Sequence, residues 1–228
     1  MTIIKEVTVE GKQYPVTVSD ENEALLAAAA AGRAIVGIWD PDRGGSGAGF
    51  DACLYLIGEP GAADEMLLER AVRRNAGLPW IIAETDRLLI REFTSEDPLE
   101  PESPDDGGGV FSNRILRGNY IAGQYRFHEC GLWALVEKQS GAVIGKAGIT
   151  DGELGYHIYE PFRSQGYALE ACGAIIEYAR EELGLKRLAI KTESENKASA
   201  SLAQKLGFML SGTAAEAEEG LLVFDKYL

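Results

Sequence analysis

The stretch LGYHIYEPFRSQGYALEACGAIIEY, residues 154–178, decides the fold. Residues 154–160 are rich in apolar and aromatic side chains, which is typical of a strand. Residues 161–166 predict a short loop, and a helix follows from Tyr167. Apolar residues recur in this helix at helical spacing, and Gly184 marks its end. The stretch therefore predicts a strand, a glycine-containing loop and a helix in direct succession.

Such a succession can build a binding site for an anion. The first turn of a helix has backbone N–H groups without intrahelical partners, and the helix dipole is positive there. Gly166 lets the backbone approach a phosphate closely because it has no Cβ, and Arg163 can add a charged hydrogen bond. Taken alone, the loop is equally consistent with an ordinary connection that carries a surface arginine.

The segment after this helix favours the interpretation of the loop as an anion site. Residues 187–192 (RLAIKT) alternate like a strand, and residues 197–206 predict a helix that ends at Gly207. At this point the chain resembles the GNAT superfamily of N-acetyltransferases. Residues 163–168 (RSQGYA) match the family's R/Q-x-x-G-x-G/A loop, which holds the pyrophosphate of coenzyme A. Residues 196–208 (NKASASLAQKLGF) match its N-x-x-A/S-x-x-L-x-x-x-x-G-F segment.

An earlier segment resembles the ribosomal-protein and protein N-terminal branch of that superfamily. Residues 82–93 (IAETDRLLIREF) carry the branch's T-x-R-L-x-L-R pattern and are predicted to form one opening strand. Residues 94–97 fit a helix start, but the prolines and glycines of residues 98–110 predict a loop where family members continue the helix. This departure leaves the acceptor open, since this region helps to shape the acceptor site in the family.

The remaining elements complete the predicted acetyltransferase domain. Residues 119–127 predict a helix, residues 132–138 and 142–150 two strands joined by a turn, and residues 221–227 a final strand. Together with the resemblance, they imply an α/β (α+β) class and the GNAT acyl-CoA N-acyltransferase fold over residues 81–228. In that fold helices flank a mixed central sheet.

Residues 1–80 predict a separate, small α/β domain. Strands are expected at residues 14–18, 34–39 and 52–57, and helices at residues 21–31 and 64–75. Their order indicates a parallel sheet, and the pattern resembles a fragment of a haloacid-dehalogenase-like or Rossmann-like fold.

Two phosphate-binding interpretations of this first domain are not supported by its residues. The segment Gly44–Gly49 does not fit G-x-G-x-x-G, because Phe50 replaces the last glycine and a strand follows, so we interpret it as a loop. No acidic pair at the end of a first strand would serve as a phosphatase nucleophile.

Composition limits the partners and the compartment. The formal net charge of -14 argues against nucleic acid and acidic membranes, and favours a cationic partner such as an amine. Three widely spaced cysteines favour a reducing cytoplasm over a disulfide framework. The N-terminus lacks a signal-peptide apolar segment, and no apolar run approaches the ~20 residues that span a bilayer. His128, Glu129 and Cys130 are consecutive and cannot easily chelate one ion, so no metal is predicted.

The resemblance implies a reaction and a set of binding residues. A primary amine, on a protein N-terminus or a small molecule, attacks acetyl-CoA directly and takes its acetyl group. A backbone N–H near Ile158 or Tyr159 stabilises the oxyanion. The oligomeric state is left open, with a homodimer as one option. The implied cofactor-binding residues are His157, Ile158, Tyr159, Arg163, Ser164, Gln165, Gly166, Tyr167, Ala168 and Asn196.

The catalytic groups are less clearly indicated. The attacking amine must first lose a proton, since its pKa is about 8 for an α-amine and about 10.4 for a lysine. Glu153 is the predicted base, and Glu160 is the less favoured carboxylate. Many family members protonate the leaving thiolate with a tyrosine, but Ala203 stands in its place here. Ser199 is the predicted hydrogen-bond donor to the sulfur, and a serine facing solvent is equally consistent.

The missing tyrosine and the interrupted first helix leave a second function open. The alternative is a module of the same fold that binds and senses CoA without turnover.

Overall fold

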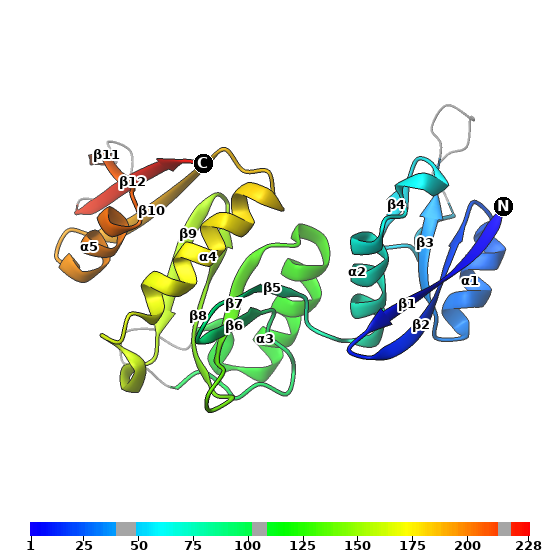
Figure 1. The fold of residues 1–228 in the computed structure, drawn as a ribbon, viewed down its shortest axis with the longest axis horizontal. Helices are drawn as coiled ribbons and strands as arrows, with labels where there is room; N and C mark the ends of the chain where they lie inside the picture. Colours follow the sequence, from blue (N-terminus) through cyan, green and yellow to red (C-terminus); the bar gives the residue numbers. More distant parts are fainter. Residues whose placement is uncertain (40–48, 102–108, 214–219) are drawn as a thin grey trace. The chain divides into compact units, whose positions relative to one another are not determined.

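A computed structural model describes residues 1–39, 49–101, 109–213 and 220–228 of the chain. The chain divides into two compact units, Met1–Trp80 and Ile81–Leu228 (Figure 1). Most of the glycine-rich segment that we interpret as a loop, residues 44–48, lies outside the described residues, and so do residues 102–108 of the second predicted loop. Within the described parts, no helix combines the length and the apolar character needed to cross a bilayer.

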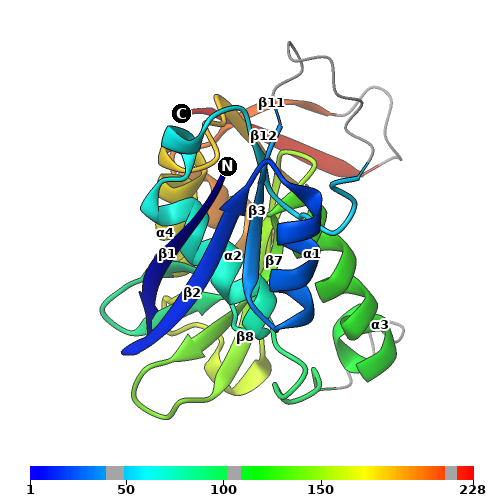
Figure 2. The same ribbon diagram turned by 90° about the vertical axis from the view of Figure 1, so that its right-hand side faces the viewer.

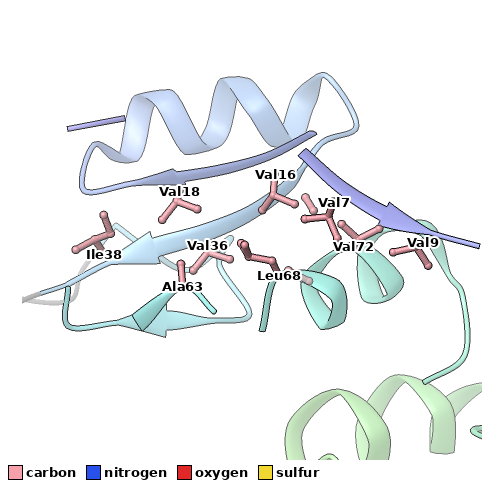
Figure 3. Close-up of a cluster of buried hydrophobic side chains, with 11 residues drawn as sticks. Val7, Val9, Val16, Val18, Val36, Ile38, Ala63, Leu68 and Val72 are labelled. Carbon is pink, nitrogen blue, oxygen red and sulfur yellow. The ribbon is translucent and has the colours of Figure 1, made fainter. Parts of the chain in front are cut away.

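The first unit is a four-stranded sheet with a helix on each face. The strands lie in the order β1-β2-β3-β4, and Figure 2 shows the first three side by side. Figure 3 shows α1 and α2 on opposite sides of the sheet, with valines of three strands packed against Leu68 and Val72 of α2. The elements are β1 (Thr2–Val9), β2 (Lys12–Ser19), α1 (Asn22–Ala30), β3 (Ala34–Ile38), β4 (Leu56–Ile57), a 3₁₀ helix (Pro60–Ala62) and α2 (Glu65–Ala76).

Strand β1 was not predicted from the sequence. It pairs antiparallel with β2 through a two-residue turn in which Glu10 has φ 51° and Gly11 has φ 77°. Positive φ at both residues gives the turn type that matches the twist of a hairpin. The expectation of a wholly parallel sheet is therefore wrong at this edge, although β2, β3 and β4 are parallel. The strand predicted at residues 52–57 is reduced to two residues.

The second unit is built on one eight-stranded sheet, in the order β11-β12-β10-β9-β8-β7-β6-β5. Figure 1 shows α4 along β8 and β9, with α5 beside β10. The prediction of a mixed sheet flanked by helices is confirmed. The elements are β5 (Ile81–Glu84), β6 (Leu88–Arg91), a 3₁₀ helix (Val110–Ser112), α3 (Arg114–Tyr120), a π-helix (Ile121–His128), β7 (Gly131–Glu137), β8 (Val143–Thr150), β9 (Glu153–Ile158), a 3₁₀ helix (Glu160–Phe162), α4 (Tyr167–Glu181), β10 (Arg187–Glu193), α5 (Lys197–Lys205), β11 (Met209–Thr213) and β12 (Leu221–Tyr227).

The two central strands β9 and β10 separate after their first residues. They are parallel and share a single paired position, Ala189 with Glu153, where the Ala189 N–H donates to the Gly152 carbonyl at 3.0 Å. On its other side β9 is paired with β8 along its whole length. Beyond Glu153, the edge of β9 that faces β10 is therefore open.

The segment before this sheet core differs from the prediction. The strand expected over residues 82–93 is a hairpin of β5 and β6, because Thr85 turns the chain and its N–H donates to the Leu88 carbonyl at 2.8 Å. The helix start expected at residues 94–97 is a turn. Asp97 holds this turn by accepting two hydrogen bonds from Arg91, at 2.8 and 2.7 Å, and one from the Thr94 N–H at 2.7 Å.

Candidate functional site

The loop between β9 and α4 presents backbone N–H groups. Gly166 is the N-cap of α4 with φ 85°, and no side chain of the described residues caps this helix. Ser164 also has a positive φ, 61°. Left-handed residues in a turn direct successive N–H groups toward one point, and the helix dipole adds positive potential there. The loop thus has the backbone geometry of an anion site, and its binding of the pyrophosphate stays a prediction.

A clamp from the β5–β6 turn holds this loop in place. The Glu170 carboxylate, in the first turn of α4, accepts hydrogen bonds from Thr85 Oγ1 at 2.6 Å, Arg87 N at 3.0 Å and Arg87 Nε at 2.7 Å. Arg87 Nη1 also donates to the Gln165 carbonyl at 3.0 Å, and its guanidinium lies 4.3 Å from the centre of the Tyr167 ring. Burial opposes ionisation of Glu170, but the bonds from Thr85 and Arg87 outweigh it and lower its pKa. This clamp explains the spacing of threonine and arginine in the T-x-R pattern.

Arg87→Met should weaken CoA binding about tenfold with only a small loss of stability, because the loop loses its fastening while the core is untouched. Calorimetry with CoA, alongside thermal unfolding, measures both quantities. Arg180→Met is the matched control, since Arg180 lies near the other end of α4 and pairs with the neighbouring Glu181 at 2.9 Å. Equal CoA affinities for the two variants would contradict a role for the clamp.

One face of β9 carries a hydroxyl pair. Tyr156 lies near Ser199 of α5 and near Cys172 of α4. Burial raises the pKa of the Tyr156 phenol, and the nearby Ser199 hydroxyl opposes this in part. Ser199 is itself buried, so the solvent-facing alternative is wrong. Asn196 caps α5, its Oδ1 accepting from the Ser199 N–H at 3.0 Å.

The opposite face of β9 carries a charged cluster around one buried carboxylate. Glu100, whose side chain is 2% exposed, accepts from Lys146 Nζ at 2.6 Å through Oε2. Its Oε1 lies 3.6 Å from Nδ1 of His157. Arg163 reaches the same histidine from the loop, with Nη2 3.2 Å from Nε2, and its Nε donates to the Ile158 carbonyl at 2.9 Å. Sequence reasoning missed Glu100 and Lys146, and the only signal was a lysine within the apolar strand β8.

The two predicted carboxylates lie outside this cluster. Glu153 forms an ion pair with Lys191, at the position where β9 and β10 are still joined. Glu160 is 84% exposed and lies 3.6 Å from Arg163. Glu153 stays a predicted base, but it would have to give up its lysine to accept a proton.

The backbone of β9 offers an oxyanion donor. The Tyr159 N–H donates to the Ile144 carbonyl of β8 at 2.9 Å and is therefore engaged. Successive amides of a strand point to opposite edges, so the Ile158 N–H points into the opening beside β10. Of the two residues near which the sequence places the oxyanion donor, Ile158 is therefore the one whose N–H points into this opening.

Several of the predicted cofactor-binding residues lie along the opening between β9 and β10, whereas Glu153 lies where these strands are still joined. His157, Ile158, Arg163 and the loop up to Ala168 lie on its β9 side, and Ser199 approaches from α5. Within the loop, the Gln165 side chain donates to the Pro161 carbonyl at 3.0 Å. Among the residues that the structure describes, no three His, Cys, Asp or Glu side chains are grouped as a metal ion requires.

Comparisons with known proteins agree with this geometry. Residues 87–209 match the family model described as "Acetyltransferase (GNAT) domain". The Bacillus subtilis protein YkkB, itself uncharacterized, is 29% identical over 160 residues, which cover 62% of this chain and 93% of YkkB. An acetyltransferase structure from Agrobacterium tumefaciens is 25% identical with a TM-score of 0.52, over 64% of this chain and 94% of that one. RimL, a ribosomal L7/L12 α-N-protein acetyltransferase in complex with coenzyme A, has a similar fold, with a TM-score of 0.54 at 15% identity over 65% of this chain and 98% of that one.

Proposed function

Because the chain belongs to the acetyltransferase (GNAT) domain family, we propose that it transfers the acetyl group of acetyl-CoA to a primary amine by direct attack. The observation that carries this proposal is the opening between β9 and β10, which leads to the Gly166 loop. The pantetheine arm enters the opening, and the loop holds the pyrophosphate. The Ile158 N–H then points at the place where the thioester carbonyl becomes an oxyanion.

The sulfur leaves on the side of α5. A thiol has a pKa near 8.5, so its thiolate is a good leaving group that needs little help. The hydroxyls of the half-buried Tyr156 and the buried Ser199 supply a hydrogen bond to it, in the absence of the tyrosine that Ala203 replaces. Since one neutral hydrogen bond contributes about 1 kcal/mol, this assistance is modest.

The acceptor is the amine of a protein N-terminus or of a small molecule. The formal net charge of -14 attracts cations, which raises the encounter rate with an ammonium-bearing acceptor. The three free cysteines agree with a reducing cytoplasm as the working compartment.

Release of free thiol from acetyl-CoA tests this function. The full chain is incubated with acetyl-CoA and a panel of peptides with free N-termini, polyamines and amino sugars, and the products are weighed by mass spectrometry. The same peptides with blocked N-termini are the matched control. We expect thiol release that depends on a free amine, with one acetyl group added to the acceptor. Tight CoA binding without any acetylated product, even in a cell extract, would instead favour a CoA-sensing module.

A further inference from the structure

The contact between Arg163 and His157 indicates which ring nitrogen carries the proton. The Arg163 guanidinium has donors only, so at the 3.2 Å contact His157 Nε2 must accept. The proton of the neutral ring is then on Nδ1, which faces Glu100 Oε1 at 3.6 Å. This oxygen is buried and has no hydrogen-bond partner among the described residues. A small movement would close the gap and give a carboxylate–imidazole pair.

We propose that His157 is the general base of the reaction, that Glu100 positions its ring, and that Arg163 covers its basic nitrogen until acetyl-CoA binds. This inference rests on the proposed function and names its general base, which the proposed function leaves unassigned. It assigns to the His157 side chain a role beyond the cofactor contact that the sequence predicts.

The position of His157 suits a base. His157 is paired with Lys146 of β8 and follows Tyr156 directly in β9. Successive side chains of a strand point to opposite faces, so the His157 side chain lies on the sheet face opposite Tyr156 and Ser199. The thioester in the opening would then have hydroxyl groups on one side, next to the leaving sulfur, and an imidazole on the other. An amine that approaches from the His157 side meets the base without meeting the leaving group.

Charged groups of both signs surround His157. The Glu100 carboxylate beside it is paired with the Lys146 ammonium at 2.6 Å. The Arg163 guanidinium lies at Nε2 of His157, and the centre of the Tyr159 ring is 5.8 Å from that of the imidazole. Histidine is the side chain best suited to proton transfer near neutral pH.

Because of Arg163, the access of a proton to His157 Nε2 should depend on bound acetyl-CoA. The Arg163 side chain is 50% exposed and belongs to the loop that fits the pyrophosphate. A phosphate oxygen makes a stronger, charge-assisted bond with a guanidinium than a neutral imidazole nitrogen does. Acetyl-CoA would therefore draw Arg163 away and uncover Nε2, which makes acetyl-CoA the first substrate to bind productively.

The proton transfers balance. An ammonium acceptor gives one proton to His157 Nε2, and the neutral amine attacks the thioester carbonyl carbon to form the C–N bond. When the tetrahedral intermediate collapses, the C–S bond breaks with its electron pair on sulfur. The nitrogen then loses its second proton and the thiolate gains one. The products are an amide, free CoA and an imidazolium, which returns its proton to solvent.

Nitrogen NMR of the two histidines tests the arrangement without turnover. His128 and His157 are the only histidines, so His128→Gln and His157→Gln assign both rings. We expect the Nδ1–H form of His157 in the free protein, and a change at Nε2 on addition of CoA that His128 does not show. In Arg163→Met the free protein should already show the uncovered Nε2. An Nε2–H form in the free protein, or CoA binding seen by calorimetry without a change at His157, would overturn the role of Arg163.

Rates at several pH values test the base. His157→Gln should lower kcat/KM about 100-fold at neutral pH with CoA affinity kept, and the deficit should shrink as pH rises and the amine loses its proton unaided. Glu100→Gln should lower it about tenfold and also weaken the Nδ1–H preference in the NMR spectrum, which a merely structural role would not do. His128→Gln is the control and should keep the wild-type rate.

The Glu153→Gln variant decides between the two candidate bases. It should keep the wild-type pH profile if His157 is the base. A pH-dependent loss in Glu153→Gln, with none in His157→Gln, would overturn the proposal and return the role to Glu153. If the wild type acetylates no amine, the base role fails together with the proposed function, and the NMR result still decides whether CoA displaces Arg163.

Discussion

Gly166→Glu should abolish binding of CoA and acetyl-CoA. The glycine has φ 85°, a backbone conformation in which an ordinary L residue loses roughly 1–2 kcal/mol. The added carboxylate would also stand at the N-terminus of α4, where the loop N–H groups would bind it instead of a phosphate. Charge repulsion and this competition together should weaken binding at least 100-fold, since each tenfold step corresponds to about 1.4 kcal/mol.

The other end of the same helix supplies the control for this substitution. Gly184 has φ 62°, and a Cβ added there would meet nothing within 4 Å. Gly184→Glu therefore introduces a similar backbone strain and the same charge far from the loop, and it should bind CoA like the wild type. Calorimetry measures the CoA affinity of both variants, and thermal unfolding compares their stabilities. Together they separate the effect of backbone strain from the effect of a carboxylate in the phosphate-binding loop. Unchanged CoA affinity in Gly166→Glu would place the pyrophosphate elsewhere.

The elements around the loop were predictable because short-range rules determine them. Strand β9, the turn to positive φ at Gly166 and the apolar stripe of α4 all follow from residue types within about 25 residues of one another. The cap of α5 by Asn196 is likewise a local interaction, with its Oδ1 bonded to an N–H three residues later. These are the parts for which a family motif can exist as a short pattern.

What the sequence did not predict depends on contacts between distant residues. Thr85 turns the chain where a long strand was expected, and its hydroxyl bonds Glu170, which is 85 residues away. Glu100 lies in a segment without regular structure, and its partner Lys146 is 46 residues further along. No periodicity marks such pairs, because they exist only after the sheet has assembled. The candidate base His157 is one of the predicted cofactor-binding residues, but its side-chain partners came from the structure alone.

Arg117→Met should produce the largest loss of stability among the substitutions considered. The Arg117 side chain is 1% exposed in α3, and it donates to three backbone carbonyls, those of Pro98 at 2.8 Å, Ser95 at 3.1 Å and Asp97 at 2.7 Å. Methionine fills a similar volume but donates nothing, so these carbonyls lose their bonds to Arg117. The bond to Asp97 is buried and the other two are partly buried, so at about 1–3 kcal/mol for an unsatisfied buried group we expect the free energy of unfolding to fall by roughly 2–4 kcal/mol.

The same substitution should also affect the site. The three carbonyls belong to the turn that leads to Glu100, so releasing it should separate Glu100 from Lys146 and His157. We expect acetyl transfer to fall more than CoA affinity, because the Gly166 loop is fastened independently by Arg87. Rates and CoA affinities are compared at a temperature where the variant is folded.

Arg114→Met on the same helix is the matched control. Arg114 is exposed, and its one bond to this turn is a long contact of 3.4 Å from Nη1 to the Ser95 carbonyl. Its loss should change the free energy of unfolding by no more than about 0.5 kcal/mol, as for most surface substitutions. Denaturant unfolding of both variants gives the comparison. If Arg117→Met unfolded at the same denaturant concentration as Arg114→Met, water would be satisfying the three carbonyls. The turn that carries Glu100 would then be held mainly by the ion pair of Asp97 with Arg91.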